Sequence, residues 1–298
     1  MKKIRALLAL FLCLVIFVAP VLAADETTAA TPDDASQSAD TSAEAAVSAA
    51  PEYHANAKAA LLIDLNTGRT IYEQDADEQV YPASLTKIMT CMLALEDLLY
   101  CMMVESGNEA ANAVAEHIGG TIEDFVKMMN ERAYELGCTH THFMNPHGLH
   151  NESHYTTARD LSLIVQAALK SENFRTITNT AEYTLPATNL SDERVLKTTN
   201  MLIFQNSGNR YYYPKAIGIK TGYTTPAGRC VISAAKSSGM YLLGIICGAE
   251  TTVLETGDIQ MESFPECINL FNYGFDNFSY VSVLSPLYPV AQVSVLNS

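Results

Sequence analysis

The segment Ser84–Asn108 reads SLTKIMTCMLALEDLLYCMMVESGN, with Ser-x-x-Lys at its start, Ser-x-Asn at its end and no turn residue in the run that joins them. Residues three apart share one face of a helix, so this spacing predicts that the Lys87 amine lies beside the Ser84 hydroxyl. Serine is a weak nucleophile by itself, and a neighbouring amine kept neutral by burial can take its proton. On its own, the four-residue pattern is also typical of a solvated helix face.

Two other short motifs strengthen the catalytic interpretation. Ser106-Gly107-Asn108 presents a hydroxyl and an amide in an expected turn before a new helix, and Lys220-Thr221-Gly222 follows an apolar run in an expected strand. A glycine in a strand lets another backbone or a ligand approach closely. Three such motifs in this order indicate an acyl-transfer site with a serine nucleophile.

The spacing of the first two motifs leaves two arrangements open. A continuous helix would separate Ser84 from Ser106 by about 33 Å, which is far beyond the reach of proton transfer. A break near Leu95 and Glu96, with Asp97 as the cap of a second helix running back, would return Ser106 to the level of Ser84. The two serines would then be separated by about 8–10 Å, the distance between packed helices.

The remaining pattern predicts one mixed α/β (α+β) domain. Two β-prone runs flank Asn66-Thr67-Gly68, which is typical of a hairpin, and three apolar runs between residues 218 and 247 are spaced like consecutive antiparallel strands. Strands at both ends of the domain therefore predict an antiparallel sheet flanked by helices. The expected helices are Ser84–Leu95, Glu109–His117, Ile122–Leu136 with Gly137 as its stop, and Ala158–Leu169 with Thr157 and Asp160 as a capping pair.

The N-terminal region has the features of an export signal followed by a tether. Residues 1–23 combine a basic start, an apolar run and small residues before a cleavage site, as in a signal peptide. Residues 24–52 are mainly Ala, Ser, Thr, Asp and Glu, a composition too polar for a core, and predict a disordered linker. We expect a catalytic domain over 53–276, a C-terminal stub over 277–298, and no evident membrane anchor after removal of the signal.

Charge and cysteine content narrow the classes of partner. The net charge of −15 argues against nucleic acid, because no basic surface is available to release phosphate counterions. Much of this charge lies in the linker and so implies nothing about a cationic substrate. Outside the signal, an even number of cysteines permits disulfides in an exported protein, but small buried thiols are the expected role of most of them. They are Cys91, Cys101, Cys138, Cys230, Cys247 and Cys267.

With these motifs in place, the chain resembles the serine D-alanyl-D-alanine carboxypeptidases among the low-molecular-mass penicillin-binding proteins. The similarity runs from about Lys58 to Phe275. It implies the serine β-lactamase or penicillin-binding-protein fold, and removal of the terminal D-alanine from peptidoglycan stem peptides in the extracytoplasmic cell-wall or periplasmic space. It also implies inhibition by β-lactam antibiotics, with no metal or organic cofactor. The matching stretches are AALLIDLNTGRTIYEQDADEQVYPASLTKIMT, DLLYCMMVESGNEAANAVAEHIGG, HFMNPHGLHNESHYTTARDLSLI and GIKTGYTTPAGRCVISAAK.

The resemblance also implies catalytic roles. Ser84 would attack the carbonyl of the penultimate D-alanine, and Lys87 would be the general base. Ser106 would relay a proton to the leaving amine, and the charge of Lys220 would tune that transfer. A preorganised pocket with two lysines and two hydroxyls suits a reaction in which charge develops on one oxygen.

Substrate binding is implied for a second set of residues. Asn108 would orient the peptide amide, and Thr221 would bind the substrate carboxylate. Gly222 would allow close approach, and the backbone N–H groups of Ser84 and Tyr223 would form the oxyanion hole.

Three features depart from the family pattern. Ser106 follows Ser84 at a spacing of only 22 positions, whereas several dozen residues separate the two motifs in the family, as though a segment were missing between Glu96 and Asp97. No arginine follows Arg229, although family members often use a later arginine to clasp the terminal carboxylate. The sequence after Phe278 is too short for the usual small β domain and membrane-binding helix.

These departures keep other interpretations open. One is a catalytically impaired pseudoenzyme that binds cell-wall peptide or β-lactam without turnover, and another is an incomplete product that does not fold stably. A β-lactamase is a weaker alternative, because no Glu-x-x-Leu-Asn segment lies between the second and third motifs. Zinc is a further minor alternative, since five histidines crowd into fifteen residues. They are His140, His142, His147, His150 and His154.

Overall fold

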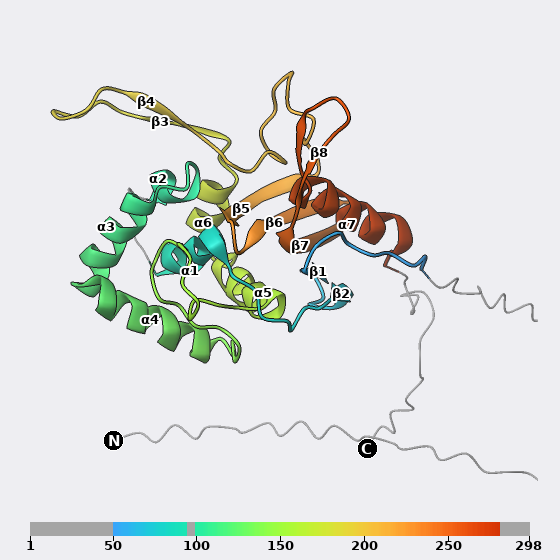
Figure 1. The fold of residues 1–298 in the computed structure, drawn as a ribbon, viewed down its shortest axis with the longest axis horizontal. Helices are drawn as coiled ribbons and strands as arrows, with labels where there is room; N and C mark the ends of the chain where they lie inside the picture. Colours follow the sequence, from blue (N-terminus) through green and yellow to red (C-terminus); the bar gives the residue numbers. More distant parts are fainter. Residues whose placement is uncertain (1–49, 94–98, 281–298) are drawn as a thin grey trace, which may run out of the picture. The chain divides into compact units, whose positions relative to one another are not determined.

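The computed structural model describes residues 50–93 and 99–280. Five strands form an antiparallel sheet in the order β2-β1-β7-β6-β5, so the first strands of the domain lie beside the last ones (Figure 1). The predicted sheet built from both ends of the domain is therefore confirmed. Its strands are β1 (Ala59–Asp64), β2 (Thr70–Gln74), β5 (Ala216–Thr224), β6 (Gly228–Ser237) and β7 (Met240–Ala249).

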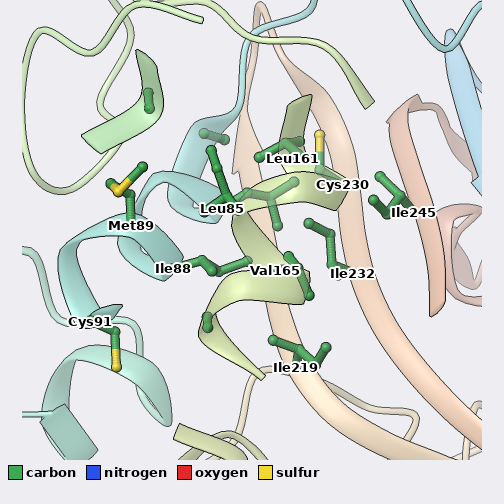
Figure 2. Close-up of a cluster of buried hydrophobic side chains, with 14 of the residues drawn as sticks. Leu85, Ile88, Met89, Cys91, Leu161, Val165, Ile219, Cys230, Ile232 and Ile245 are labelled. Atoms are coloured by element: carbon green, nitrogen blue, oxygen red, sulfur yellow. The ribbon is translucent and has the colours of Figure 1, made fainter. Parts of the chain in front are cut away.

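Alternating side chains of the sheet pack into two hydrophobic clusters, one on each face. Leu62 and Ile246 face α7 (Ser263–Asn277), whereas Ile232 and Ile245 face the other helices. Figure 2 shows this second cluster, in which side chains of α1 (Lys87–Met92) and α5 (Ala158–Ala168) pack against β5, β6 and β7. Because side chains on a strand point alternately to opposite faces, both faces can be covered by helices.

The run between the first two motifs is not one continuous helix. A short helix, η1 (Ala83–Thr86), leads into α1, which ends at Met92, and α2 (Leu99–Met103) begins after residues 94–98. The predicted cap Asp97 lies outside the described residues. After α2, Ser106 takes a left-handed φ of 67° and α3 (Asn108–Gly119) begins. Within the described residues the helix expected from Ser84 ends at Met92, and its predicted last residue, Leu95, lies outside them.

The helix boundaries reflect their caps. The predicted helix after residue 121 is α4 (Ile122–Glu135), and Gly137 follows it with a φ of 86°, a left-handed conformation that suits glycine. The Thr157 hydroxyl accepts the Asp160 N–H at 3.0 Å and caps α5. The Asp160 carboxylate does not return this contact and instead accepts the His140 N–H at 2.8 Å, so only half of the expected capping pair forms.

Several short elements lie outside the predicted pattern. The β3–β4 hairpin extends away from the central sheet (Figure 1). In the described residues no helix is long and apolar enough to cross a membrane. The six cysteines among the described residues all carry free thiols, and all but Cys101 are buried. The additional elements are α6 (Glu172–Thr178), β3 (Glu182–Leu185), β4 (Arg194–Lys197), β8 (Thr251–Val253) and β9 (Ile259–Met261).

Candidate active site

Ser84 lies in η1, where backbone from two other parts of the chain approaches it closely. A Cβ added at Gly222 of β5 would lie 3.0 Å from Ser84 N, and one added at Gly148 would lie 1.8 Å from Ala83 O. Gly148 has a φ of 89°, and Ala83 has a φ of 47°, which is unusual for a residue with a side chain. The turn that carries Ser84 is therefore fixed between β5 and the loop containing Gly148.

Lys87 follows one helical turn later and is fully buried. Its Nζ lies 3.0 Å from Ser84 Oγ, 2.7 Å from Asn108 Oδ1 and 2.8 Å from the carbonyl oxygen of His147. Burial lowers the pKa of Lys87 to about 7, although the nearby carboxylate of Glu109 raises it. Near neutral pH, a large fraction of this amine is therefore uncharged.

The three partners of Lys87 fit a neutral amine that acts as a base. Asn108 Oδ1 and the His147 carbonyl oxygen can only accept hydrogen bonds, so they take the two N–H groups of an uncharged amine. Ser84 is the only partner with a proton to give. The nitrogen lone pair is then left to face the Ser84 hydroxyl, which is the arrangement that general-base activation of a serine requires.

Ser106 of the second motif lies next to Lys220 of the third motif. Lys220 Nζ lies 2.8 Å from Ser106 Oγ and 3.0 Å from the carbonyl oxygen of Thr221. Burial, and then the positive charge of Lys87, hold the pKa of Lys220 well below its usual value. Two buried cations near each other repel, so the two lysines favour states in which at least one is neutral.

These groups surround a cavity of about 390 Å³. Five of the eight predicted site residues line it, namely Ser84, Ser106, Thr221, Gly222 and Tyr223. The other three are Lys87, Asn108 and Lys220, and each of these lysines lies within hydrogen-bonding distance of a lining serine. All three motifs therefore assemble around one cavity, despite the short connection between the first two.

The site includes residues that the sequence analysis did not identify. Thr199 Oγ1 lies 2.7 Å from Thr221 Oγ1 in the cavity wall, and Arg229 lines the same cavity. The His147 carbonyl oxygen orients the Lys87 amine. No catalytic motif names any of the three residues, although Arg229 and His147 both lie within stretches that carry the family resemblance, GIKTGYTTPAGRCVISAAK and HFMNPHGLHNESHYTTARDLSLI.

His154 supports the turn of Ser84 from behind. Its Nδ1 accepts the Met144 N–H at 3.1 Å, so Nε2 carries the proton and donates to Thr86 Oγ1 at 2.8 Å. Thr86 Oγ1 donates in turn to the Ala83 carbonyl oxygen at 2.8 Å. Burial, together with neighbouring histidines, lowers the pKa of His154 to about 4, which keeps the ring neutral. Because both of its ring nitrogens form hydrogen bonds, His154 links the Met144 backbone to the turn that contains Ser84.

The histidine cluster does not converge on a common point. The His142 Nδ1 lies 2.7 Å from the Ser153 carbonyl oxygen, and the ring of His150 packs edge-on against Tyr81. Within residues 50–93 and 99–280, no group of three or more His, Cys, Asp or Glu side chains is placed to hold a metal ion. The described geometry therefore gives no support to the zinc alternative.

Comparison with known proteins agrees with this geometry. The family model of D-alanyl-D-alanine carboxypeptidases, peptidase S11, matches residues 44–97 and 92–251. The two matched segments meet at residues 92–97, within the short connection between the first two motifs. DacF of Bacillus subtilis, a D-alanyl-D-alanine carboxypeptidase, is 34% identical over 233 residues, covering 65% of this chain and 58% of DacF.

Solved structures show the same fold. The crystal structure of the Streptomyces K15 DD-transpeptidase has a TM-score of 0.67 and 26% identity, and covers 76% of this chain and 99% of that protein. Penicillin-binding protein D2 of Listeria monocytogenes, in its ampicillin-bound form, has a TM-score of 0.63 and 26% identity over 76% of this chain and 99% of that one. The chain spans less than two thirds of the length of the first curated relatives, 58% and 64%. Family match, shared fold and assembled motifs together place the chain in the peptidase S11 family of D-alanyl-D-alanine carboxypeptidases.

Proposed function

We propose that the protein is an exported, penicillin-sensitive serine carboxypeptidase that removes the terminal D-alanine from peptidoglycan stem peptides through an acyl-enzyme. The observation that carries this proposal is the contact of 3.0 Å between Lys87 Nζ and Ser84 Oγ, made by a buried amine. The family to which the chain belongs supports the substrate class. The sequence of residues 1–23 supports export to the extracytoplasmic side.

Acylation follows from the positions of the two serine–lysine pairs. Lys87 takes the Ser84 proton as Oγ attacks the carbonyl carbon of the penultimate D-alanine. The resulting oxyanion accepts hydrogen bonds from the backbone N–H groups of Ser84 and Tyr223. Gly222, which directly precedes Tyr223, lies close to Ser84 N. This proximity supports a shared oxyanion hole formed by the two backbone N–H groups.

Departure of the leaving group requires a proton at its nitrogen. Ser106 donates that proton and recovers one from Lys220, which lies 2.8 Å away. The C–N bond then breaks, D-alanine leaves with a neutral amine, and an ester joins the shortened peptide to Ser84. Water then attacks this ester and gives up a proton to the lysine that is neutral at this stage. The shortened peptide leaves, and Ser84 Oγ regains the proton that Lys87 had taken.

The rate of Ser84 acylation is expected to depend on pH through Lys87. The reactive form is the neutral amine, whose fraction increases as the pH rises through its pKa of about 7. We therefore expect the rate constant for acylation by benzylpenicillin to rise about tenfold per pH unit below 7 and to level off above it. Rapid-mixing measurements from pH 5 to pH 9 check this profile.

Glu109→Gln provides a sharper version of the pH experiment. The Glu109 carboxylate raises the pKa of Lys87, so its removal should move the inflection of the rate profile to lower pH. Glu116→Gln on the same helix is the matched control, because Glu116 is also exposed and does not perturb Lys87. An inflection that does not move in Glu109→Gln, or moves equally in both variants, would argue against Lys87 as the titrating base.

The second candidate function is binding of cell-wall peptide or β-lactam without turnover. The chain spans only part of the length of its relatives, and few residues connect the first two motifs. Acylation of Ser84 would therefore not by itself establish that the acyl-enzyme is hydrolysed. Release of D-alanine from a stem-like peptide ending in D-Ala-D-Ala, measured beside Ser84→Ala, distinguishes the two. Catalytic release lost in Ser84→Ala supports the carboxypeptidase, whereas stoichiometric acylation without release supports the binding protein.

A further inference from the structure

Arg229 occupies a position in the active-site wall that no catalytic motif predicts. It lies on β6 directly across from Tyr223 of β5, and both residues line the cavity that contains Ser84. Its guanidinium carbon lies 4.1 Å from the centroid of the Tyr223 ring. Its Nε donates a hydrogen bond to Thr251 Oγ1 at 3.2 Å. The side chain is therefore held flat at one edge of the cavity.

These two contacts leave one edge of the guanidinium available. Tyr223 covers a flat face and Thr251 engages Nε, so the remaining donors are those of the two terminal nitrogens. In the described part of the chain no carboxylate forms an ion pair with Arg229, and neither terminal nitrogen has a protein hydrogen-bond partner. A guanidinium edge of this kind matches the two oxygens of a carboxylate.

The substrate class supplies a carboxylate at the required distance. In a peptide ending in D-Ala-D-Ala, the terminal carboxyl carbon is three bonds from the carbonyl carbon that Ser84 attacks, which is less than about 4 Å. The group that binds this carboxylate must therefore lie in the same cavity as Ser84. Arg229 meets that condition, and the hydroxyls of Thr199 and Thr221 lie in the same wall.

The other cations of the site are poorly suited to this task. Lys87 and Lys220 are fully buried, and Ser84, Ser106 and backbone carbonyl oxygens already occupy their amines. Burial also lowers the pKa of Lys87 to about 7 and holds the pKa of Lys220 well below its usual value, so both sites disfavour a charged amine. The guanidinium of Arg229 instead offers a planar pair of donors whose geometry matches a carboxylate, which a lysine amine does not.

We infer that Arg229 of β6 binds the terminal carboxylate of the substrate and replaces the later arginine that family members often use. This inference rests on the proposed function, because it assigns a specificity role within the same site. It also explains how the chain can recognise a free C-terminus although no arginine follows residue 229. The recognising group of this chain then lies on β6, the strand next to the third motif on β5.

The test measures binding rather than turnover. Ser84→Ala, which cannot be acylated, is titrated by NMR with a stem-like peptide ending in D-Ala-D-Ala and with the same peptide amidated at its C-terminus. We expect the free acid to bind at least about tenfold more tightly than the amide. In Ser84→Ala/Arg229→Gln we expect binding of the acid to weaken about 10–100-fold, and binding of the amide to change less than about threefold.

Two further variants separate a specific role from general charge. In the Ser84→Ala background, Arg229→Lys should restore part of the preference for the acid, since a lysine keeps the charge but loses the two-pronged geometry. Arg210→Gln is the matched control, because Arg210 also stacks on a tyrosine, Tyr211, but lies outside the cavity wall. It should leave the preference unchanged. Thermal unfolding of each variant confirms that the fold is retained.

Each result supports or overturns the assignment. A preference for the free acid that disappears in Arg229→Gln but persists in Arg210→Gln supports it, even if the wild-type protein releases no D-alanine. In that case the carboxypeptidase activity fails while the binding role of Arg229 stands. The assignment is wrong if Ser84→Ala does not prefer the acid, if Arg229→Gln retains the preference, or if it weakens acid and amide equally.

Discussion

Replacing Lys87 by methionine is expected to slow the acylation of Ser84 by benzylpenicillin by about 10²–10⁴-fold, the usual contribution of a general base. Methionine fills a similar volume but cannot accept the serine proton. The amine lies 3.0 Å from Ser84 Oγ, and its two other partners are carbonyl oxygens, so no other described group within its reach can take over. Rate constants come from the time course of adduct formation at fixed pH.

Lys87→Arg distinguishes loss of the base from loss of charge. Arginine keeps a cation near Ser84 but cannot act as a base, so we expect it to be as slow as Lys87→Met. Lys127→Met is the surface control, because Lys127 is exposed on α4 and pairs only with Asp124. Fast acylation in Lys87→Arg would show that the lysine acts through its charge and that another group takes the proton.

Replacing Gly148 by alanine is expected to lower the free energy of unfolding by about 3 kcal/mol or more. The added Cβ would meet the backbone of the Ser84 turn, at 1.8 Å from Ala83 O and 2.3 Å from Ala83 C. The left-handed φ of 89° adds further strain. Thermal unfolding should show a decrease in Tm of about 6–12 °C, together with slower acylation, because the turn that orients Ser84 must move.

Gly137→Ala is the matched control for this experiment. Gly137 has a similar φ of 86°, but a Cβ there meets nothing within 4 Å. It should therefore cost only the conformational strain, about 1 kcal/mol, and leave acylation unchanged. Equal destabilisation of the two variants, with normal acylation in both, would show that the close approach of Gly148 to Ala83 does not hold the nucleophile.

The sequence predicted the parts of the fold that have a strong local pattern. The hairpin at Gly68 and the meander of β5, β6 and β7 combine apolar runs with turn residues, so both were recognised. Helix α7 was not predicted, although Phe264, Cys267 and Phe271 recur at helical spacing and are buried against the sheet. Its buried face also includes small residues, among them a cysteine and a glycine, and these weaken the apolar pattern of an amphipathic helix.

Residues of the site were predictable where a motif names them. The contact between Ser84 and Lys87 follows from their spacing, but the return of Ser106 to the same cavity could not be derived, because no glycine or proline marks the break between α1 and α2. Arg229 was missed for another reason. Its position opposite Tyr223 depends on the register between β5 and β6, and a shift of one residue would turn it to the other face.

Ser84 and Lys87 are expected to form a working acylation site despite the short connection that follows them. The most direct test is the intact mass of the protein lacking residues 1–23, after incubation with benzylpenicillin, beside the same measurement on Ser84→Ala. We expect a mass increase of one benzylpenicillin molecule in the first protein and none in the variant. A protein that unfolds cooperatively yet forms no adduct, or an adduct that persists in Ser84→Ala, would contradict this account.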